Sequence, residues 1–422
     1  MKRFFALLLV LALTLSVVGC GKSTGSVSSD SSGETQDLMA DISVENISIS
    51  PDIPAGTAAV TDFGVRLAQN SLKGGENLLI SPLSVLSALA MTANGAENTT
   101  RIQMEEVFGI SIEALNSYLR WYVESLPQGE NYSLRLANSI WFSEDTRFVP
   151  EREFLQCNAD YYGADIYTAP FNESTKDAIN RWVADETNGM IDQILDRIPE
   201  DALMYLVNAL AFEAQWSDMY EDHQVRDGIF TREDGTQQDV EMMHGQEYRY
   251  LSDELTTGFI KNYEDRSYAF VALLPREGIS MEDYVAALTG ERIMALLNNS
   301  ESMPVLTSMP KFETEYSVEL SEVLVGMGMT DAFSWQKADF SALGTSKDGN
   351  IHIERVLHKT FISVTQQGTR AGAATVVELT DGAAILPDKI QEVYLDRPFV
   401  YLLIDCENGL PFFIGVLMDA EK

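Results

Sequence analysis

The sequence predicts one α+β domain that follows an N-terminal export signal. Helical and strand-like segments are mixed from about residue 51 onward, without the regular strand–helix–strand repeat of a parallel α/β protein. Apolar segments lie at both ends of this region, which indicates a single core that includes the C-terminus. The 422 residues suffice for a large core, and they show no convincing internal repeat.

The chain is strongly acidic, with 64 Asp and Glu residues against 29 Lys and Arg residues and a formal net charge of −35. Nucleic acids and anionic lipid surfaces bind clustered positive charge, so we expect no nucleic-acid partner and no electrostatic attraction to a membrane. The acidic residues are not gathered in a tail, and we attribute the charge to solubility.

Residues 1–19 have the composition of a signal peptide, because Lys2 and Arg3 precede an apolar stretch that is too short to span a membrane comfortably. The stretch ends in VVGC, where Gly19 and Cys20 resemble the lipobox of bacterial lipoproteins. The alternative is an ordinary secretory signal with an incidental cysteine. A lipidated Cys20 predicts an extracytoplasmic protein that is anchored to a bacterial membrane or cell surface.

Residues 20–50 are rich in Ser, Gly and Asp and nearly free of aromatic residues, which predicts a flexible tether. The folded domain is then expected over residues 51–422. With Cys20 assigned to the lipid, Cys157 and Cys406 remain, and no C-x-x-C pair indicates zinc or thiol redox chemistry. The simpler interpretation of these two cysteines is ordinary packing or an exposed free thiol, and a disulfide between them is the alternative.

The domain's elements follow in order from their patterns. Helical spacing over 57–72 precedes a short strand at 77–80 and a buried helix that begins at Ser81-Pro82, since Pro suits the first helical position. An amphipathic helix over 174–191 ends at Asn188-Gly189. The remaining expected elements are strands at 133–143, 202–216, 267–275, 303–316 and 356–365, a helix at 318–329 and a C-terminal hairpin at 397–419.

No catalytic constellation is found. The four histidines lack metal-ligand spacing, and a serine hydrolase built from Ser81 or Ser84 with His358 would have no Gly-rich turn to expose an oxyanion hole. We therefore expect no enzyme activity, no metal and no cofactor.

Residues 366–378, QQGTRAGAATVVE, directly follow an expected buried strand and contain a run of small residues from Ala371 to Ala374. Such a run buries little apolar surface, and its composition is typical of a segment that adopts more than one conformation.

Six stretches of the sequence closely resemble the serpin family and fall in family order over about residues 52–420. They are NLLISPLSVLSALAMTANGA, LANSIWF, LVNALAFEAQW, MPKFETEYSVELSEVLVGMGM, VLHKTFISVTQQGTRAGAAT and DRPFVYLLID with PFFIGVLMD. The resemblance implies three β-sheets, eight or nine helices and an exposed reactive loop that ends near residues 396–399. It further implies that the small-residue run is the hinge of this loop, which enters the largest sheet as a new central strand after a protease has cut beyond it. The hinge residues so implied are Gly368, Thr369, Ala371, Gly372, Ala373, Ala374 and Thr375.

Strand geometry agrees with this role for the hinge. Side chains alternate along a strand, so Thr369, Ala371, Ala373 and Thr375 would all face the packed side of the sheet, and all are small. We also expect Gly368 and Gly372 to keep the segment mobile before insertion.

The resemblance assigns two further sets of residues. Ser81, Ser84, Asn208 and His358 match the polar cluster beneath the opening of the main sheet, called the shutter, with ordinary caps and core hydrogen bonds as the alternative. Trp216 matches the aromatic residue of the breach, at the top of the sheet where the loop first enters, with plain core packing as the alternative.

Family spacing places the scissile bond after Gly382, sixteen positions beyond Gln366, so Gly382 and Ala383 form the expected reactive bond. No Lys or Arg occurs from 371 through 388, which makes trypsin-like proteases poor targets and favours elastase-like or subtilisin-like proteases. The sequence departs from the family at Gln366 and Arg370, where acidic residues are usual, and carries several extra residues before Arg397.

The resemblance thus implies an irreversible suicide-substrate inhibitor that acts as a monomer. Its partner would be a serine protease, with cysteine proteases as a second class, held in a covalent acyl complex. A non-inhibitory serpin that acts as a binding module at the cell surface is the alternative, and a surface adhesin is a third possibility. Non-inhibitory members tend to carry Pro or bulky charged residues at inward hinge positions, and none occurs here from Thr369 to Thr375.

Overall fold

The computed structural model describes residues 35–421, apart from 128, 130, 131, 145–147, 199–201, 203, 348 and 370–389. The chain divides into two units, 1–33 and 34–422, and the fold below is that of the second unit. Its described residues form nine α-helices, two short 3₁₀ helices and three β-sheets of seven, nine and two strands. The α+β class and the three sheets are therefore confirmed.

The helices are α1 (Ile53–Ser71), α2 (Pro82–Ala93), α3 (Asn98–Phe108), α4 (Ile112–Ser125), α5 (Arg152–Tyr162), α6 (Glu173–Glu186), α7 (Met281–Ala286), α8 (Gly290–Asn298), α9 (Ser321–Gly326) and the 3₁₀ helices η2 (Asp222–Gln224) and η3 (Glu264–Arg266). The strands are β1 (Gln36–Asp37), β2 (Leu78–Ile80), β3 (Tyr132–Ser143), β4 (Val149–Pro150), β5 (Asp165–Ala169), β6 (Met204–Gln215), β7 (Val225–Thr231), β8 (Gln237–Ser252), β9 (Thr256–Asn262), β10 (Tyr268–Pro275), β11 (Glu301–Pro310), β12 (Phe312–Glu319), β13 (Gly344–Thr345), β14 (Arg355–Val364), β15 (Gly368–Thr369), β16 (Gln391–Tyr394), β17 (Phe399–Asp405) and β18 (Pro411–Leu417). None of the helices in this part of the chain is long and apolar enough to cross a membrane.

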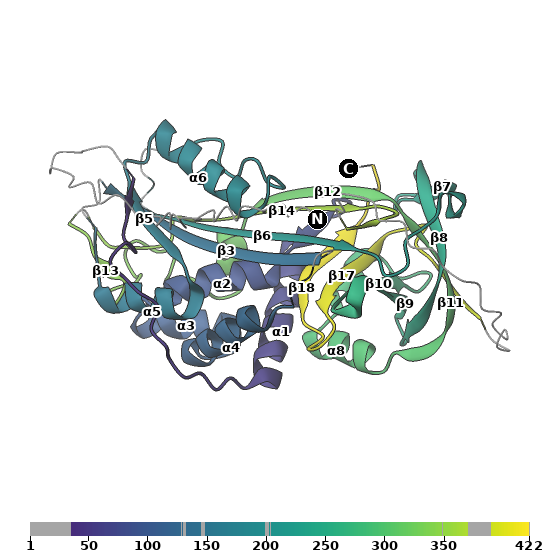
Figure 1. The fold of residues 1–422 in the computed structure, drawn as a ribbon, viewed down its shortest axis with the longest axis horizontal. Coiled ribbons are helices and arrows are strands. Elements are labelled where there is room, and N and C mark those ends of the chain that lie inside the picture. Colours follow the sequence, from purple (N-terminus) through teal and green to yellow (C-terminus); the bar gives the residue numbers. More distant parts are fainter. Residues whose placement is uncertain are drawn as a thin grey trace, which may run out of the picture. The chain divides into compact units, whose positions relative to one another are not determined.

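The seven-stranded sheet is a layer between helices. Its strand order is β1-β5-β3-β6-β15-β14-β12, and α6 lies on one face while α2 packs against the other (Figure 1). Side chains of β6 alternate between two hydrophobic clusters: Leu206 and Leu210 face the main core, whereas Tyr205 and Val207 face a smaller cluster beneath α6. This two-residue period makes β6 a central strand that is buried on both faces.

The nine-stranded sheet carries the C-terminus into the core. Its main path is β16-β11-β8-β9-β10-β17-β18-β2, with β7 paired to β8. The expected C-terminal hairpin is confirmed as β17 and β18, whose residues are all buried. The core therefore depends on the end of the chain, as the pattern of apolar segments predicted.

Local sequence signals explain how α2 begins. Ser81 is the N-cap, its side chain accepts a hydrogen bond from the backbone N–H of Ser84, and Pro82 occupies the first helical position. Every residue of α2 is buried, which confirms the prediction of a buried helix from a nearly continuous apolar face.

Two expected elements differ in the structure. The strand expected over 303–316 is two strands in different sheets, β11 and β12, with Lys311 between them donating its backbone N–H to Glu241. The helix expected over 318–329 is shorter, because Val318 and Glu319 still pair with β14 and α9 begins at Ser321. Pairing along β14 thus overrides the local helical spacing.

The second half of the expected tether lies against the domain. Strand β1 pairs with β5, and Leu38, Met39 and Ile42 pack on the main core. The backbone N–H of Glu45 also donates to a side-chain oxygen of Asp160. The expectation of a flexible tether through residue 50 therefore does not fit residues 36–45, which pair with β5 and pack three partly buried apolar side chains on the domain, while Val44 is exposed.

Candidate functional site at the hinge

The first two hinge residues form a strand of the seven-stranded sheet. Gly368 and Thr369, as β15, pair antiparallel with Gln215 and Ala214 of β6, and Thr369 also pairs with Val364 of β14. The side chain of Thr369 is 2% exposed, and its hydroxyl is in hydrogen-bond contact with the Tyr263 hydroxyl. The Thr369 side chain thus lies on the packed side of the sheet, where the insertion hypothesis places it, and insertion itself stays a prediction.

Gly368 has a different function from the mobility that we expected of it. A Cβ atom at this position would overlap the carbonyl oxygen of Ala214 and would lie 2.8 Å from Cα of Gln215. Glycine is thus required because the backbone of β15 approaches β6 closely, and the residue is held in a sheet.

Residues 365–368 form a tight turn, named here the pivot turn, between β14 and β15. The backbone N–H of Thr365 donates to the carbonyl of Gly368 at 2.9 Å, and the Thr365 hydroxyl donates to the same oxygen at 3.1 Å. The turn fixes the register between β14 and the first hinge residues.

Below β15, strands β6 and β14 converge again at the far end of the sheet. There Arg355 pairs with Tyr205 and Val356 with Leu206, in parallel. Between the two places run residues 357–363 of β14 and 207–213 of β6, which pair on their outer sides with β12 and β3. The first hinge residues therefore lie at the head of the interval between the two central strands.

Trp216 contacts the pivot turn directly. Its indole N–H donates to the carbonyl of Thr365 at 2.9 Å, and its backbone N–H donates to the carbonyl of Gln367 at 2.9 Å. The indole also stacks on the Tyr263 ring, with centroids 4.4 Å apart and planes 9° apart. Trp216 is thus a buried core residue and a hinge contact at the same time, so the two interpretations offered for it are not exclusive.

Gln366, where the family usually has an acid, makes polar contacts without a charge. Its side-chain amide donates to an Asp222 carboxylate oxygen at 3.3 Å, and its carbonyl accepts from the backbone N–H of Tyr220.

Three of the four expected shutter residues are buried, and two of them are joined by a hydrogen bond. The backbone N–H of Ser81 donates to Nε2 of His358 at 3.1 Å, which joins β14 to the start of α2. Burial lowers the pKa of His358 to about 4, and the neutral ring with a free Nε2 lone pair is the form that this hydrogen bond requires. Ser84 contributes its backbone N–H to the cap, and the side chain of Asn208 lies outside the described residues, so the grouping is seen for the other three.

Two contacts of the site were not foreseen. Thr360, two residues after His358 on the same face of β14, donates its hydroxyl to the carbonyl of Leu79 at 2.7 Å. Tyr263, whose hydroxyl meets the hinge threonine, has a pKa raised by burial. The period-two spacing of His358 and Thr360 could have indicated the first contact, whereas nothing local in the sequence indicates the second.

Several predicted residues lie outside the described part of the chain. They are the hinge residues Ala371, Gly372, Ala373, Ala374 and Thr375, the reactive-bond residues Gly382 and Ala383, and the lipidation candidate Cys20.

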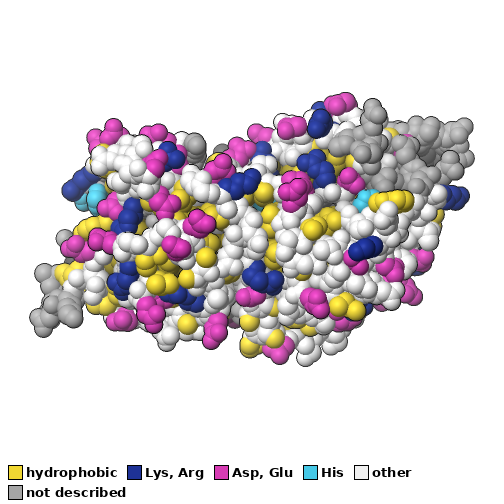
Figure 2. Space-filling model, turned by 180° about the vertical axis from the view of Figure 1, so that it is seen from behind, with side chains coloured by type: hydrophobic (Ala, Val, Ile, Leu, Met, Phe, Trp, Pro, Cys, Tyr) yellow, Lys and Arg dark blue, Asp and Glu magenta, His cyan; other side chains and the backbone are white. Residues whose placement is uncertain are grey.

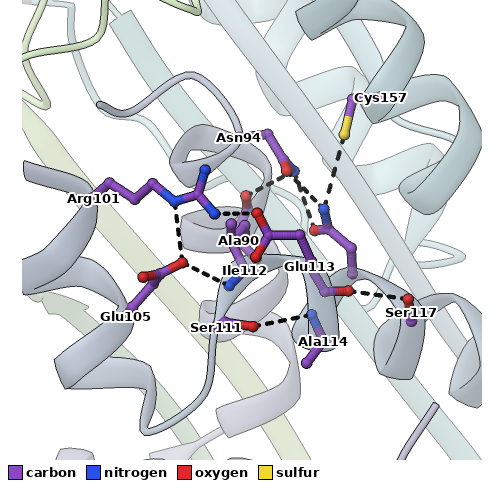
Figure 3. Close-up of polar contacts among 11 residues, drawn as sticks. Ala90, Asn94, Arg101, Glu105, Ser111, Ile112, Glu113, Ala114, Ser117 and Cys157 are labelled. Carbon is purple, nitrogen blue, oxygen red and sulfur yellow. Dashed lines mark hydrogen bonds and ion pairs between the residues drawn. The ribbon is translucent and has the colours of Figure 1, made fainter. Parts of the chain in front are cut away.

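The two remaining cysteines are free thiols. Cys157 lies beside a polar network between α2, α4 and α5, where the Asn116 amide group donates to its sulfur at 3.9 Å and to the Asn94 side chain at 2.7 Å (Figure 3). Burial raises the pKa of Cys157 to about 12 and that of Cys406 to about 11, so both thiols are protonated at neutral pH. The disulfide alternative is therefore not realised.

The charge of the described surface is mixed. On the face shown in Figure 2, Asp and Glu side chains are spread over the surface, with single Lys and Arg residues among them. No continuous basic patch is seen on this face, in keeping with the composition.

Comparison with known proteins identifies the fold. The serpin (serine protease inhibitor) family model matches residues 58–420. An uncharacterized serpin-like protein of Thermococcus kodakarensis is 31% identical over 86% of this chain and 85% of its own length, and the human leukocyte elastase inhibitor is 28% identical over 86% and 97%. The native-state crystal structure of the thermophilic serpin tengpin matches with a TM-score of 0.87 and 46% identity, covering 92% of this chain and all of the other. These similarities agree with the observed fold, in which β15 lies between β6 and β14. The chain therefore belongs to the serpin family.

Proposed function

We propose that this serpin is an irreversible inhibitor of serine proteases that traps the acyl-enzyme by inserting its cleaved reactive loop into the seven-stranded sheet. The observation that carries the proposal is the position of Thr369. The first inward hinge residue is already buried in register between β6 and β14, so that strand growth can continue from it without any change of topology.

Energetics favour continued insertion once the loop is cut. A strand of about 12–15 residues forms ladder hydrogen bonds worth roughly 1 kcal/mol each, or on the order of 10 kcal/mol before the entropy of ordering is subtracted. At about 3.3 Å per residue, the cut end would travel roughly 45 Å. A protease joined to that end as an acyl-enzyme would be carried along, and its catalytic site would be deformed before deacylation.

Small residues at the scissile bond support an elastase-like or subtilisin-like target. Counting from Gln366 gives Gly382–Ala383 as the bond, and a shallow specificity pocket fits both side chains. Relatives named leukocyte elastase inhibitor in human and mouse agree with this class of target.

We further propose that a lipid on Cys20 anchors the inhibitor outside the cytoplasm. The support is the positive start, the short apolar stretch and the VVGC sequence, which together resemble a lipoprotein signal.

Incubation with a panel of elastase-, subtilisin-, trypsin- and papain-like proteases tests the inhibitory function. We expect complexes with the first two classes that survive boiling in detergent, and a released peptide that begins at Ala383 or Ala384. A loop that every protease merely cuts, without complex formation, would instead favour the non-inhibitory binding module. A new N-terminus after Leu379 or Leu386 would refute the proposed bond.

A further inference from the structure

A buried ion pair lies next to the hinge and has no part in the proposed insertion itself. Lys261 of β9 is 2% exposed and Glu247 of β8 is 8% exposed, and Nζ of Lys261 lies 2.9 Å from Oε1 of Glu247. Both residues belong to the nine-stranded sheet, whereas the hinge belongs to the seven-stranded sheet. Burying two charges costs several kcal/mol per ion, and this cost can cancel their attraction. A contribution to stability is therefore a weak explanation for this pair.

The ammonium group of Lys261 also holds the segment that follows β6. Nζ donates to the carbonyl of Asp218 at 3.0 Å. It also lies 4.4 Å from the centroid of the Tyr220 ring and 5.3 Å from that of the Trp216 ring, within the range of cation–π attraction. One charged group thereby contacts three residues of the segment 216–220.

The segment 216–220 in turn holds the pivot turn. The backbone N–H groups of Trp216 and Tyr220 donate to the carbonyls of Gln367 and Gln366, and the Trp216 indole donates to Thr365. Removing the ammonium group would take away its contacts with Trp216, Asp218 and Tyr220, and the segment would then be held on that side by the Trp216–Tyr263 stacking and by the hydrogen bond from Ser217 to the Asn262 carbonyl.

We infer that Lys261 is a positioning residue: it aligns the donors of segment 216–220 with the pivot turn, and so keeps β15 in register for insertion. Glu247 holds the ammonium group in place from β8, and Asp218 and Tyr220 face it from the segment itself. This inference rests on the proposed function for its kinetic consequence. If the pivot turn frays, the cut loop inserts later, deacylation gains time, and a larger share of the inhibitor is consumed as substrate.

The test uses the full chain with Lys261→Met and, because that variant leaves Glu247 buried without its partner, the double variant Lys261→Met/Glu247→Leu. Ile293→Val on α8, in the main core and outside this group of contacts, is the control for a general loss of stability. Hydrogen exchange of the Trp216 and Tyr220 amides is measured by NMR on the intact, unreacted protein.

We expect both Lys261 variants to speed exchange at these two amides about tenfold or more, while the Ile293 control leaves them near the wild-type rate. With a protease that the wild type inhibits, we expect the number of inhibitor molecules consumed per trapped protease to rise at least about threefold, with no such rise in the control.

Unchanged exchange in the double variant overturns the positioning of the pivot turn, whatever the protease assay gives. Faster exchange with an unchanged number of inhibitor molecules consumed overturns the kinetic consequence. If the wild type traps no protease, the proposed function fails, and the exchange measurement still decides whether Lys261 positions the turn.

Discussion

The hydroxyl groups of Thr369 and Tyr263 are in hydrogen-bond contact in the interior. This contact joins the hinge to the residue that directly follows strand β9. Thr369 belongs to the segment that extends into the sheet under the proposed function, whereas Tyr263 stacks on Trp216 in the core. The proposed insertion would therefore begin from a buried position that is fixed by these contacts.

Thr369→Arg should convert the protein from an inhibitor into a substrate. The Thr369 side chain is buried beside Tyr263, and a guanidinium buried there without a carboxylate partner would cost several kcal/mol. Detergent-stable complexes should disappear while loop cleavage continues at the wild-type rate. Thr369→Ser, which keeps the hydroxyl, is the matched control, and equal complex formation by the Arg variant would contradict the insertion mechanism.

Gly368→Ala should displace β15 from the sheet. The added methyl group would overlap the Ala214 carbonyl oxygen, and the resulting shift should lower the free energy of unfolding by about 1–3 kcal/mol. Gly74→Ala is the control, because nothing lies within 4 Å of its added Cβ. Urea unfolding of the intact chain measures both variants, and an equal midpoint for the two would show that the close approach is not required.

The stability of the protein should fall as the pH drops below 6.5, in part because of His358. Its folded pKa of about 4 lies below the unfolded value of 6.5, so the unfolded chain takes up a proton first, and stability is lost as the pH falls from 6.5 toward 4. Between pH 7.5 and pH 5, His358 should account for a loss of about 2 kcal/mol in the free energy of unfolding. His358→Gln can still accept from Ser81, and its loss of stability over this interval should be smaller by that amount in urea unfolding at both pH values. An identical loss in both proteins would exclude His358 as the cause.

Cleavage in the loop should raise the melting temperature by roughly 10 °C, because on the order of 10 kcal/mol of new strand pairing is added to a large domain whose unfolding entropy is roughly 0.8 kcal/mol/K. Calorimetry of the intact and protease-nicked chains compares the two forms. A nicked form that melts no higher than the intact one would rule out insertion and favour the binding-module alternative.

Cys20→Ala should release the protein from membranes without any effect on protease trapping in detergent-free extracts. Loss of the lipid removes the buried methylenes, each worth about 0.8 kcal/mol of anchoring. Fractionation of cells that express either form checks this, and continued membrane retention of the variant would point to an uncleaved signal or another anchor.

Most of the large elements could be predicted from local patterns, because their signals are short-range. Ser81 with Pro82 predicts the start of α2, and Asn188 with Gly189, both of positive φ, predict the end of the helix that became α6. The C-terminal hairpin follows from two apolar runs around a turn. These features depend on caps, turns and burial that neighbouring residues decide.

The features that were missed depend on contacts distant in sequence. The division of 303–316 into β11 and β12 is decided by their different partners, β8 and β14. The docking of residues 36–45 could not be predicted from the Ser-rich composition of this segment, because the partial burial of its three apolar side chains depends on partners elsewhere in the domain. The contacts of Lys261 could not be predicted from the sequence either, because they join a strand of the nine-stranded sheet to the segment that follows a strand of the seven-stranded sheet.

The pairing of the two residues of β15 also affects the expected rate at which the cleaved loop would insert into the sheet. Starting a new strand is the slow step of pairing, because several backbone angles are fixed before the first hydrogen bond compensates for them. Here a nucleus is already present in the uncut chain, because Gly368 and Thr369 pair with β6 and Thr369 also pairs with β14. If the proposed insertion takes place, it would need only propagation from this existing end, and its competition with deacylation would be decided by the rate of elongation.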